Sequence, residues 1–171
     1  MSAHQIECYD CGMTTSSKPR RYHTALLPDL KLIVTELSGD LDLSEIQTWE
    51  DSLKQVLNEI SDSDVFKILV NLYGFTALDL EAHKYFRAII PLTLAQYGWK
   101  VGYVDLFEEA SSMSFTTTRG IRCIGAAHVH HDEGKIEKYE TKYSRSDEHY
   151  FTDPHAALKW VSELKPTQKV I

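Results

Sequence analysis

Apolar and polar residues change their spacing near the middle of the chain. Residues 68–72 form an apolar run with β-branched members that ends shortly before Gly74, and this pattern predicts a buried strand. Further on, apolar residues recur at helical spacing over residues 82–90, and Asp79 precedes them at a position suited to a helix N-cap. A strand that enters a helix through a short loop is where an open α/β sheet presents its binding edge. We therefore expect the functional edge at residues 76–83.

A β-hairpin is expected at the start of the folded part of the chain. Residues 22–27 and 31–37 have the composition of two strands, and the turn pair Pro28–Asp29 joins them. Gly39 is expected to end the second strand, because the polar and apolar pattern changes there. The chain would then leave the hairpin and enter its first helix.

Helices and strands alternate through the rest of the sequence. The first helix has Asp42 as its expected N-cap and Glu45 three residues later, which together form a capping box. Pro91 should kink or split a second helix, because its missing N–H removes a helical hydrogen bond. The expected later elements are this second helix at 80–97, a strand at 99–107, a short helix within 108–122, a strand at 124–131, a helix at 133–143, a strand at 148–151 and a last helix from Asp153 to 165.

The order of these elements defines a fold class. Strands that alternate with helices after an initial hairpin predict an α/β fold, with a mixed, mostly parallel sheet covered by helices. A length of 171 residues suits one domain. We expect a flexible leader at residues 1–21, a single domain at 22–165 and a tail at 166–171.

Charge and composition narrow the partners. The net charge of −7 argues against nucleic acid and against anionic membrane surfaces, since both require a basic surface on the protein. No stretch has the length of a membrane span and the N-terminus has no apolar signal region, so we expect a cytoplasmic protein. Cys8 and Cys11 form one C-x-x-C in the polar leader, and with Cys123 they are expected to be reduced thiols.

Two stretches resemble a known family. The sequence ILVNLYGFTALDLEA at residues 68–82 resembles the strand–loop–helix signature of STAS domains, which are named from sulfate transporters and anti-sigma-factor antagonists. The sequence HYFTDPHAALKWV at residues 149–161 is similar to the closing pattern of the SpoIIAA-like branch of that family. The resemblance extends over about residues 22–164 by element order. It implies a STAS-like fold and a binding or regulatory module. The positions in register with the signature are Asn71, Leu72, Gly74, Thr76 and Asp79.

The chain departs from that family at the start of the second helix. Anti-sigma-factor antagonists carry there a serine that accepts phosphate, whereas this chain has Leu80 and Glu81. A phosphorylation switch is therefore not expected. The resemblance implies instead a docking surface or pocket rim for a protein partner or a small apolar ligand. Asp79 has a purely structural alternative, as the cap of its helix. The candidate binding residues are Thr76, Asp79, Glu81 and His83.

A metal site is the first alternative. In the expected strand at 124–131, alternation places His128 and His130 on one face, and Asp132 follows at the strand end. Two histidines and a carboxylate could bind a divalent metal, with His149 as a further candidate ligand. This reading would make the chain a metal-binding protein or a metalloenzyme.

A homo-oligomeric scaffold is the second alternative. In that case, exposed aromatic residues such as Tyr97, Tyr139 and Tyr143 would form the interface of a homodimer. The sequence has no nucleophile elbow, phosphate-binding loop, dinucleotide fingerprint or zinc-protease motif. We therefore expect a binding module that is not an enzyme and needs no cofactor.

Overall fold

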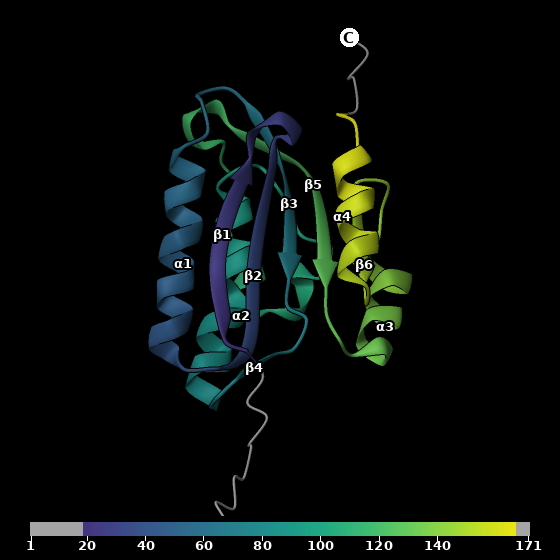
Figure 1. Cartoon of the computed structure of the whole chain (residues 1–171). Helices are drawn as coiled ribbons and strands as arrows, with labels where there is room; N and C mark the ends of the chain where they lie inside the picture. The colour runs from purple at the N-terminus through teal and green to yellow at the C-terminus, as the bar shows by residue number, and fades with distance from the viewer. Residues whose placement is uncertain (1–18, 167–171) are drawn as a thin grey trace, which may run out of the picture.

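The computed structural model describes residues 19–166 of the chain. These residues form an α/β fold with a mixed, mostly parallel sheet of six strands and with four α-helices (Figure 1). The predicted fold class is therefore confirmed. The strands are β1 (Arg21–Leu27), β2 (Leu32–Leu41), β3 (Val65–Asn71), β4 (Phe75–Ala77), β5 (Arg122–Val129) and β6 (Glu148–Phe151), and the helices are α1 (Leu43–Asn58), α2 (Leu80–Ala95), α3 (Glu133–Tyr143) and α4 (Pro154–Glu163).

The sheet has the strand order β1-β2-β3-β5-β6, and the short strand β4 pairs with the end of β2. β1 and β2 form the predicted antiparallel hairpin, and their turn contains the 3-10 helix Pro28–Leu30. All other strand pairs are parallel. The carboxyl ends of β3, β5 and β6 therefore point toward the same edge of the sheet, which is where open α/β sheets bind their ligands.

Local sequence signals fixed the starts of the helices. The Asp42 side chain accepts a hydrogen bond from the Glu45 N–H at 2.8 Å, and the Glu45 carboxylate accepts one from the Asp42 N–H at 3.3 Å. This is the predicted capping box. Asp153 caps α4 through the His155 N–H, and Pro154 stands at the first helical position. Pro91 lies inside α2, which continues as one helix to Ala95, so the proline does not split it.

Two predictions about the strands were wrong. Gly39 does not end β2, because its φ of 82° is readily available to glycine and its N–H donates to the Gly74 carbonyl at 3.0 Å. The strand continues to Leu41 and pairs there with β4, which the sequence pattern did not predict. Residues 99–107 form no strand either; they bury Trp99, Val101 and Val104 in a loop that ends in the 3-10 helix Val104–Leu106. The apolar spacing there reflects a buried loop. The segment expected to hold a short helix contains the 3-10 helices Glu108–Ser112 and Thr118–Gly120.

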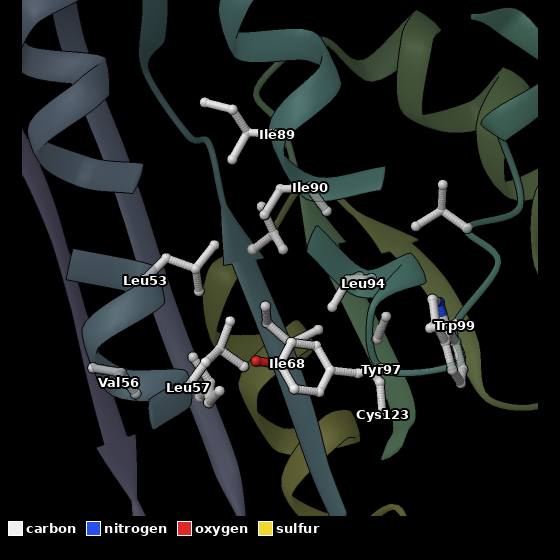
Figure 2. Packing of buried hydrophobic residues seen from close by; sticks show 14 of the residues in the cluster. Leu53, Val56, Leu57, Ile68, Ile89, Ile90, Leu94, Tyr97, Trp99 and Cys123 are labelled. Carbon is white, nitrogen blue, oxygen red and sulfur yellow. The ribbon is translucent and has the colours of Figure 1, made fainter. Parts of the chain in front are cut away.

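The sheet is covered on both faces. α1 and α2 pack their apolar faces on one side, around the fully buried Trp49 and Leu53. Figure 2 shows part of this cluster, including Leu53 of α1 and Leu94 of α2. α4 covers the other face with Ala157 and Val161. Leu158 of α4 points away from this contact and is 38% exposed.

A buried lysine joins the centre of the sheet to the end of the last helix. Lys67 of β3 is 5% exposed, and its Nζ donates to the carbonyls of Ser162 and Leu164 at 3.1 Å each. Burial lowers the pKa of this ammonium group. The two carbonyls lie at the carboxyl end of α4, where a cation interacts favourably with the helix dipole.

The domain boundaries can be compared with the structure only in part. β1 begins at Arg21, one residue before the expected start of the domain. Residues 1–18 and 167–171 lie outside the described residues, and with them the expected leader, most of the expected tail and the Cys8–Cys11 pair. No helix within residues 19–166 is long and apolar enough to cross a membrane.

Candidate functional site

A cavity of about 290 Å³ lies at the carboxyl ends of β3 and β5. Its walls come from α2, α3 and the 3-10 helix that follows the buried loop, so we call it the α2–α3 cavity. Tyr103, Tyr139 and Tyr150 add aromatic rings to a lining that combines aliphatic and aromatic side chains with a few basic ones. The apolar side chains of the walls include Leu72, Phe86, Ile90, Phe107, Val129 and Ile136.

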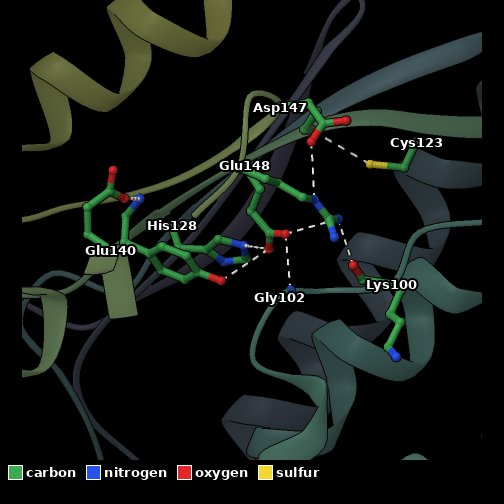
Figure 3. Close-up of polar contacts among 10 residues, drawn as sticks. Lys100, Gly102, Cys123, His128, Glu140, Asp147 and Glu148 are labelled. Carbon is green, nitrogen blue, oxygen red and sulfur yellow. Dashed lines mark hydrogen bonds and ion pairs between the residues drawn. The ribbon is translucent and has the colours of Figure 1, made fainter. Parts of the chain in front are cut away.

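A fully buried carboxylate supports one wall of the cavity. Glu148 of β6 is 0% exposed, and its Oε1 lies 2.8 Å from Nε2 of His128 and 3.3 Å from the hydroxyl of Tyr150 (Figure 3). Its Oε2 accepts a hydrogen bond from the Gly102 N–H at 3.0 Å and lies 3.0 Å from the Arg145 guanidinium. Four partners therefore satisfy this carboxylate, as burial of a charge requires.

Arg145 is itself held in place on the outer side of this network. Its Nη2 donates to the Lys100 carbonyl at 2.6 Å, its Nε pairs with Asp147 at 3.1 Å, and its guanidinium lies 4.6 Å from the centre of the Trp99 ring. The loop before Val104 is thus attached to β6 by side chains. This attachment places Tyr103 against the cavity.

His128 presents a fixed ring to the cavity. The ring stacks on Tyr150 with a centroid distance of 4.9 Å and an interplanar angle of 14°, and its edge meets Tyr103 at 5.5 Å. We assign the proton to Nε2, because the Glu148 carboxylate is an acceptor only. Within residues 19–166 Nδ1 bonds to no other group, so this nitrogen can accept a hydrogen bond from a bound molecule.

Next to it, His130 is held in its neutral form. Burial lowers the pKa of His130 to about 4 from its usual 6.5, and the neighbouring side chains of Lys135 and His131 act in the same direction. Its Nδ1 accepts a hydrogen bond from the Asp132 N–H at 3.0 Å, an arrangement that only the neutral ring allows. His130 also lines the α2–α3 cavity.

Replacing His130 with asparagine should make the free energy of unfolding depend less on pH at acidic pH. The folded-state pKa lies below the unfolded value, so the wild-type free energy of unfolding should fall as the pH drops from about 6.5 to about 4. We expect this group to account for about 1 to 2 kcal/mol of that loss, given its partial exposure. Urea unfolding of both proteins at several pH values measures this dependence of the free energy of unfolding on pH. His155→Asn, at an exposed position on α4, is the control and should keep the wild-type slope. Equal slopes in wild type and His130→Asn would contradict the assignment.

The predicted binding residues lie along the start of α2, and one of them reaches the cavity. Asp79 caps the helix, with its Oδ1 accepting from the Ala82 N–H at 2.8 Å, which confirms its structural role. Thr76 and Glu81 are exposed and do not line the cavity. His83 lies at its rim. The same region exposes Leu78 by 53% and Leu80 by 66% of their surface, an apolar pair open to solvent.

The predicted metal ligands do not come together. His128 is bonded to Glu148, and the Asp132 carboxylate is occupied as the N-cap of α3, where it accepts from the Lys135 N–H at 3.1 Å. His149 bonds to Glu140 and packs on Trp160 of α4. In the part of the chain that the structure describes, no three histidine, cysteine, aspartate or glutamate side chains are grouped to hold a metal.

Of the three aromatic residues expected to be exposed at an oligomer interface, Tyr97 is not exposed. Tyr97 is 5% exposed and packs edge-on against Phe66, so it is a core residue. Tyr139 and Tyr143 are half-buried and contact each other at 5.3 Å. These three aromatic residues therefore have partners within the chain.

Several cavity residues were missed from the sequence. Arg87 lies four residues after His83 and hence on the same face of α2, a spacing that could have revealed it. Glu148 and Tyr150 are two residues apart in β6 and therefore lie on the same face of the strand, but this spacing indicates a cavity wall less clearly. Nothing in the sequence near Lys135 indicated that it would line the cavity.

No protein-family model, no curated protein and no solved structure matches this chain.

Proposed function

We propose that the chain is a binding module for a small, largely apolar molecule, which it holds in the α2–α3 cavity. The observation that carries the proposal is the cavity itself, about 290 Å³ in volume and lined mainly by aliphatic and aromatic side chains. Ligand sites are concave, mostly apolar and furnished with a few fixed polar groups, and they are common at the carboxyl edge of parallel strands.

The energetics of the cavity favour an occupant. Apolar walls that surround a concave space offer a bound apolar molecule dispersion contacts on several sides. The side chains of Leu72, Phe86 and Ile90 pack against the core on one side and face the cavity on the other. A bound apolar molecule would make dispersion contacts with these side chains.

Fixed polar groups supply orientation. His128 is held by Glu148 and stacked on Tyr150, so its Nδ1 lone pair has one direction in the cavity. A bound molecule with a hydroxyl or N–H group near this nitrogen would bind in one orientation. The resemblance of residues 68–82 to STAS domains supports a binding module of the STAS-like, SpoIIAA-like kind.

Filling the cavity should abolish ligand retention. In native mass spectrometry of the purified full chain, we expect the wild type to carry a small-molecule adduct and Leu72→Trp to lose it, because the larger ring occupies the space beside Val129. Leu158→Trp, on α4 and away from the cavity, is the matched control and should keep the adduct. Thermal unfolding of each variant checks that it is folded.

The same measurement distinguishes ligand binding from a second candidate function, which is the docking of a protein partner. A wild-type mass equal to that of the bare chain would contradict ligand binding. It would favour a protein partner that docks on the exposed pair Leu78 and Leu80. An adduct that persists in Leu72→Trp would show that the molecule binds elsewhere.

A further inference from the structure

The α2–α3 cavity brings two cationic side chains together in a chain whose net charge is −7. The whole sequence has 25 acidic residues against 18 lysines and arginines. Among the described residues, the cavity lining in contrast includes no carboxylate and two cationic side chains, Arg87 and Lys135, beside the histidines His83, His128 and His130, of which His130 is neutral. A local excess of positive groups with low-dielectric walls concentrates anions, and these groups act more strongly there than in water.

Arg87 of α2 is available to such an anion. Its guanidinium lies 5.8 Å from the centre of the Phe107 ring, and its buried Nε has no hydrogen-bond partner within residues 19–166. Buried N–H donors are nearly always paired in folded proteins. No carboxylate in that part of the chain lies within ion-pair distance of Arg87.

Lys135 of α3 provides a second cation on the other wall. Its Nζ lies 5.5 Å from the centre of the Tyr139 ring, and within the described residues it too forms no ion pair. Burial lowers the pKa of this ammonium group, and the nearby Asp132 carboxylate acts in the opposite direction. An anion bound nearby would favour the charged form.

We infer that the cavity selects a small amphipathic anion, an apolar or aromatic body with one carboxylate, whose charge is bound by Arg87 and Lys135. This inference rests on the proposed function and specifies its ligand. An arginine fork matches the two oxygens of a carboxylate. As to size, an apolar cavity of about 150 Å³ binds benzene in another protein. The present cavity, about 290 Å³, therefore suits a body of about two rings.

The test compares two ligands of nearly the same shape that differ in charge. 2-Naphthoate carries a carboxylate on two fused rings, and 2-naphthamide replaces it with a neutral amide. Isothermal titration of the full chain should show the naphthoate binding roughly tenfold tighter or more, as for a hydrogen bond to a charged group. Arg87→Met and Lys135→Met should each reduce that preference. Arg122→Met and Lys159→Met remove exposed cations outside the cavity and should keep it.

The outcomes separate the two proposals. Equal affinity for the two ligands would overturn the anion inference and leave the apolar cavity as a binding site. A preference for naphthoate that survives in both Arg87→Met and Lys135→Met would also overturn it, because other groups would then bind the charge. Failure of both ligands to bind the wild type would contradict the proposed function and the inference together.

Discussion

Replacing Glu148 with alanine is expected to lower the free energy of unfolding by about 3 to 5 kcal/mol. The carboxylate is fully buried and contacts His128, Tyr150, Gly102 and Arg145 at 2.8 to 3.3 Å. Its removal leaves an imidazole N–H, a phenol and a backbone N–H in the interior without an acceptor. The cost of such orphaned donors is larger than the contribution of any one of the bonds. Urea unfolding of the purified variant measures the effect.

Two controls distinguish charge from shape at this position. Glu148→Gln keeps the size and one acceptor oxygen, so we expect a smaller loss of about 1 to 2 kcal/mol. Glu137→Ala removes a carboxylate from an exposed position of α3 and should change stability by less than about 0.5 kcal/mol. If Glu148→Ala were no less stable than Glu137→Ala, the network would contribute nothing to folding. Because the network positions His128, ligand retention should fall in both Glu148 variants.

Replacing Gly102 with alanine is expected to cost about 2 to 3 kcal/mol. A Cβ at this position would overlap the Tyr143 carbonyl oxygen and lie 2.9 Å from the Tyr143 Cβ. Both belong to the end of α3, which cannot move without moving the cavity wall. The Gly102 N–H also donates to Glu148, so displacement of the loop would weaken the buried network as well.

Gly125 offers the matched comparison. A Cβ there would overlap the Cδ2 atom of Leu164, the flexible end of a half-buried side chain after α4. That side chain can rotate away, so Gly125→Ala should cost less than about 1 kcal/mol, even though the overlap is at least as close. Chemical denaturation of both variants under identical conditions measures the difference. Equal losses of stability in the two variants would contradict the expectation that a side-chain neighbour moves away more easily than a backbone neighbour.

Local chemistry explains why much of the fold could be predicted. The caps at Asp42, Asp79 and Asp153 depend on residues three positions away or fewer, and all three are present. α3 and β6 have the predicted bounds, because turn residues separate clear changes of apolar period. The mixed sheet then follows from the order of the elements and from the handedness of parallel connections.

Long-range contacts explain what could not be predicted. β4 has three residues and exists only because Gly39 lets β2 continue beside it. Residues 99–107 look like a strand in apolar content, yet they are buried as a loop against β6 and α3. At the site, the sequence indicated His83 at the start of α2 and His128 in β5. It could not show that Glu148 would fix His128 or that Lys135 would face the same cavity, since these positions meet only after the sheet has formed.

The contact between Lys67 and the end of α4 also limits how far the chain can be shortened without loss of stability. Any fragment that ends before Ser162 lacks both carbonyls that accept from the lysine, and a buried ammonium without partners must lose its proton or cost several kcal/mol. The central strand of the sheet therefore depends on residues almost 100 positions further along the chain. We therefore expect a shortened version that keeps Leu164 to be more stable than one that ends before Ser162, although Leu164 follows the last element of regular structure.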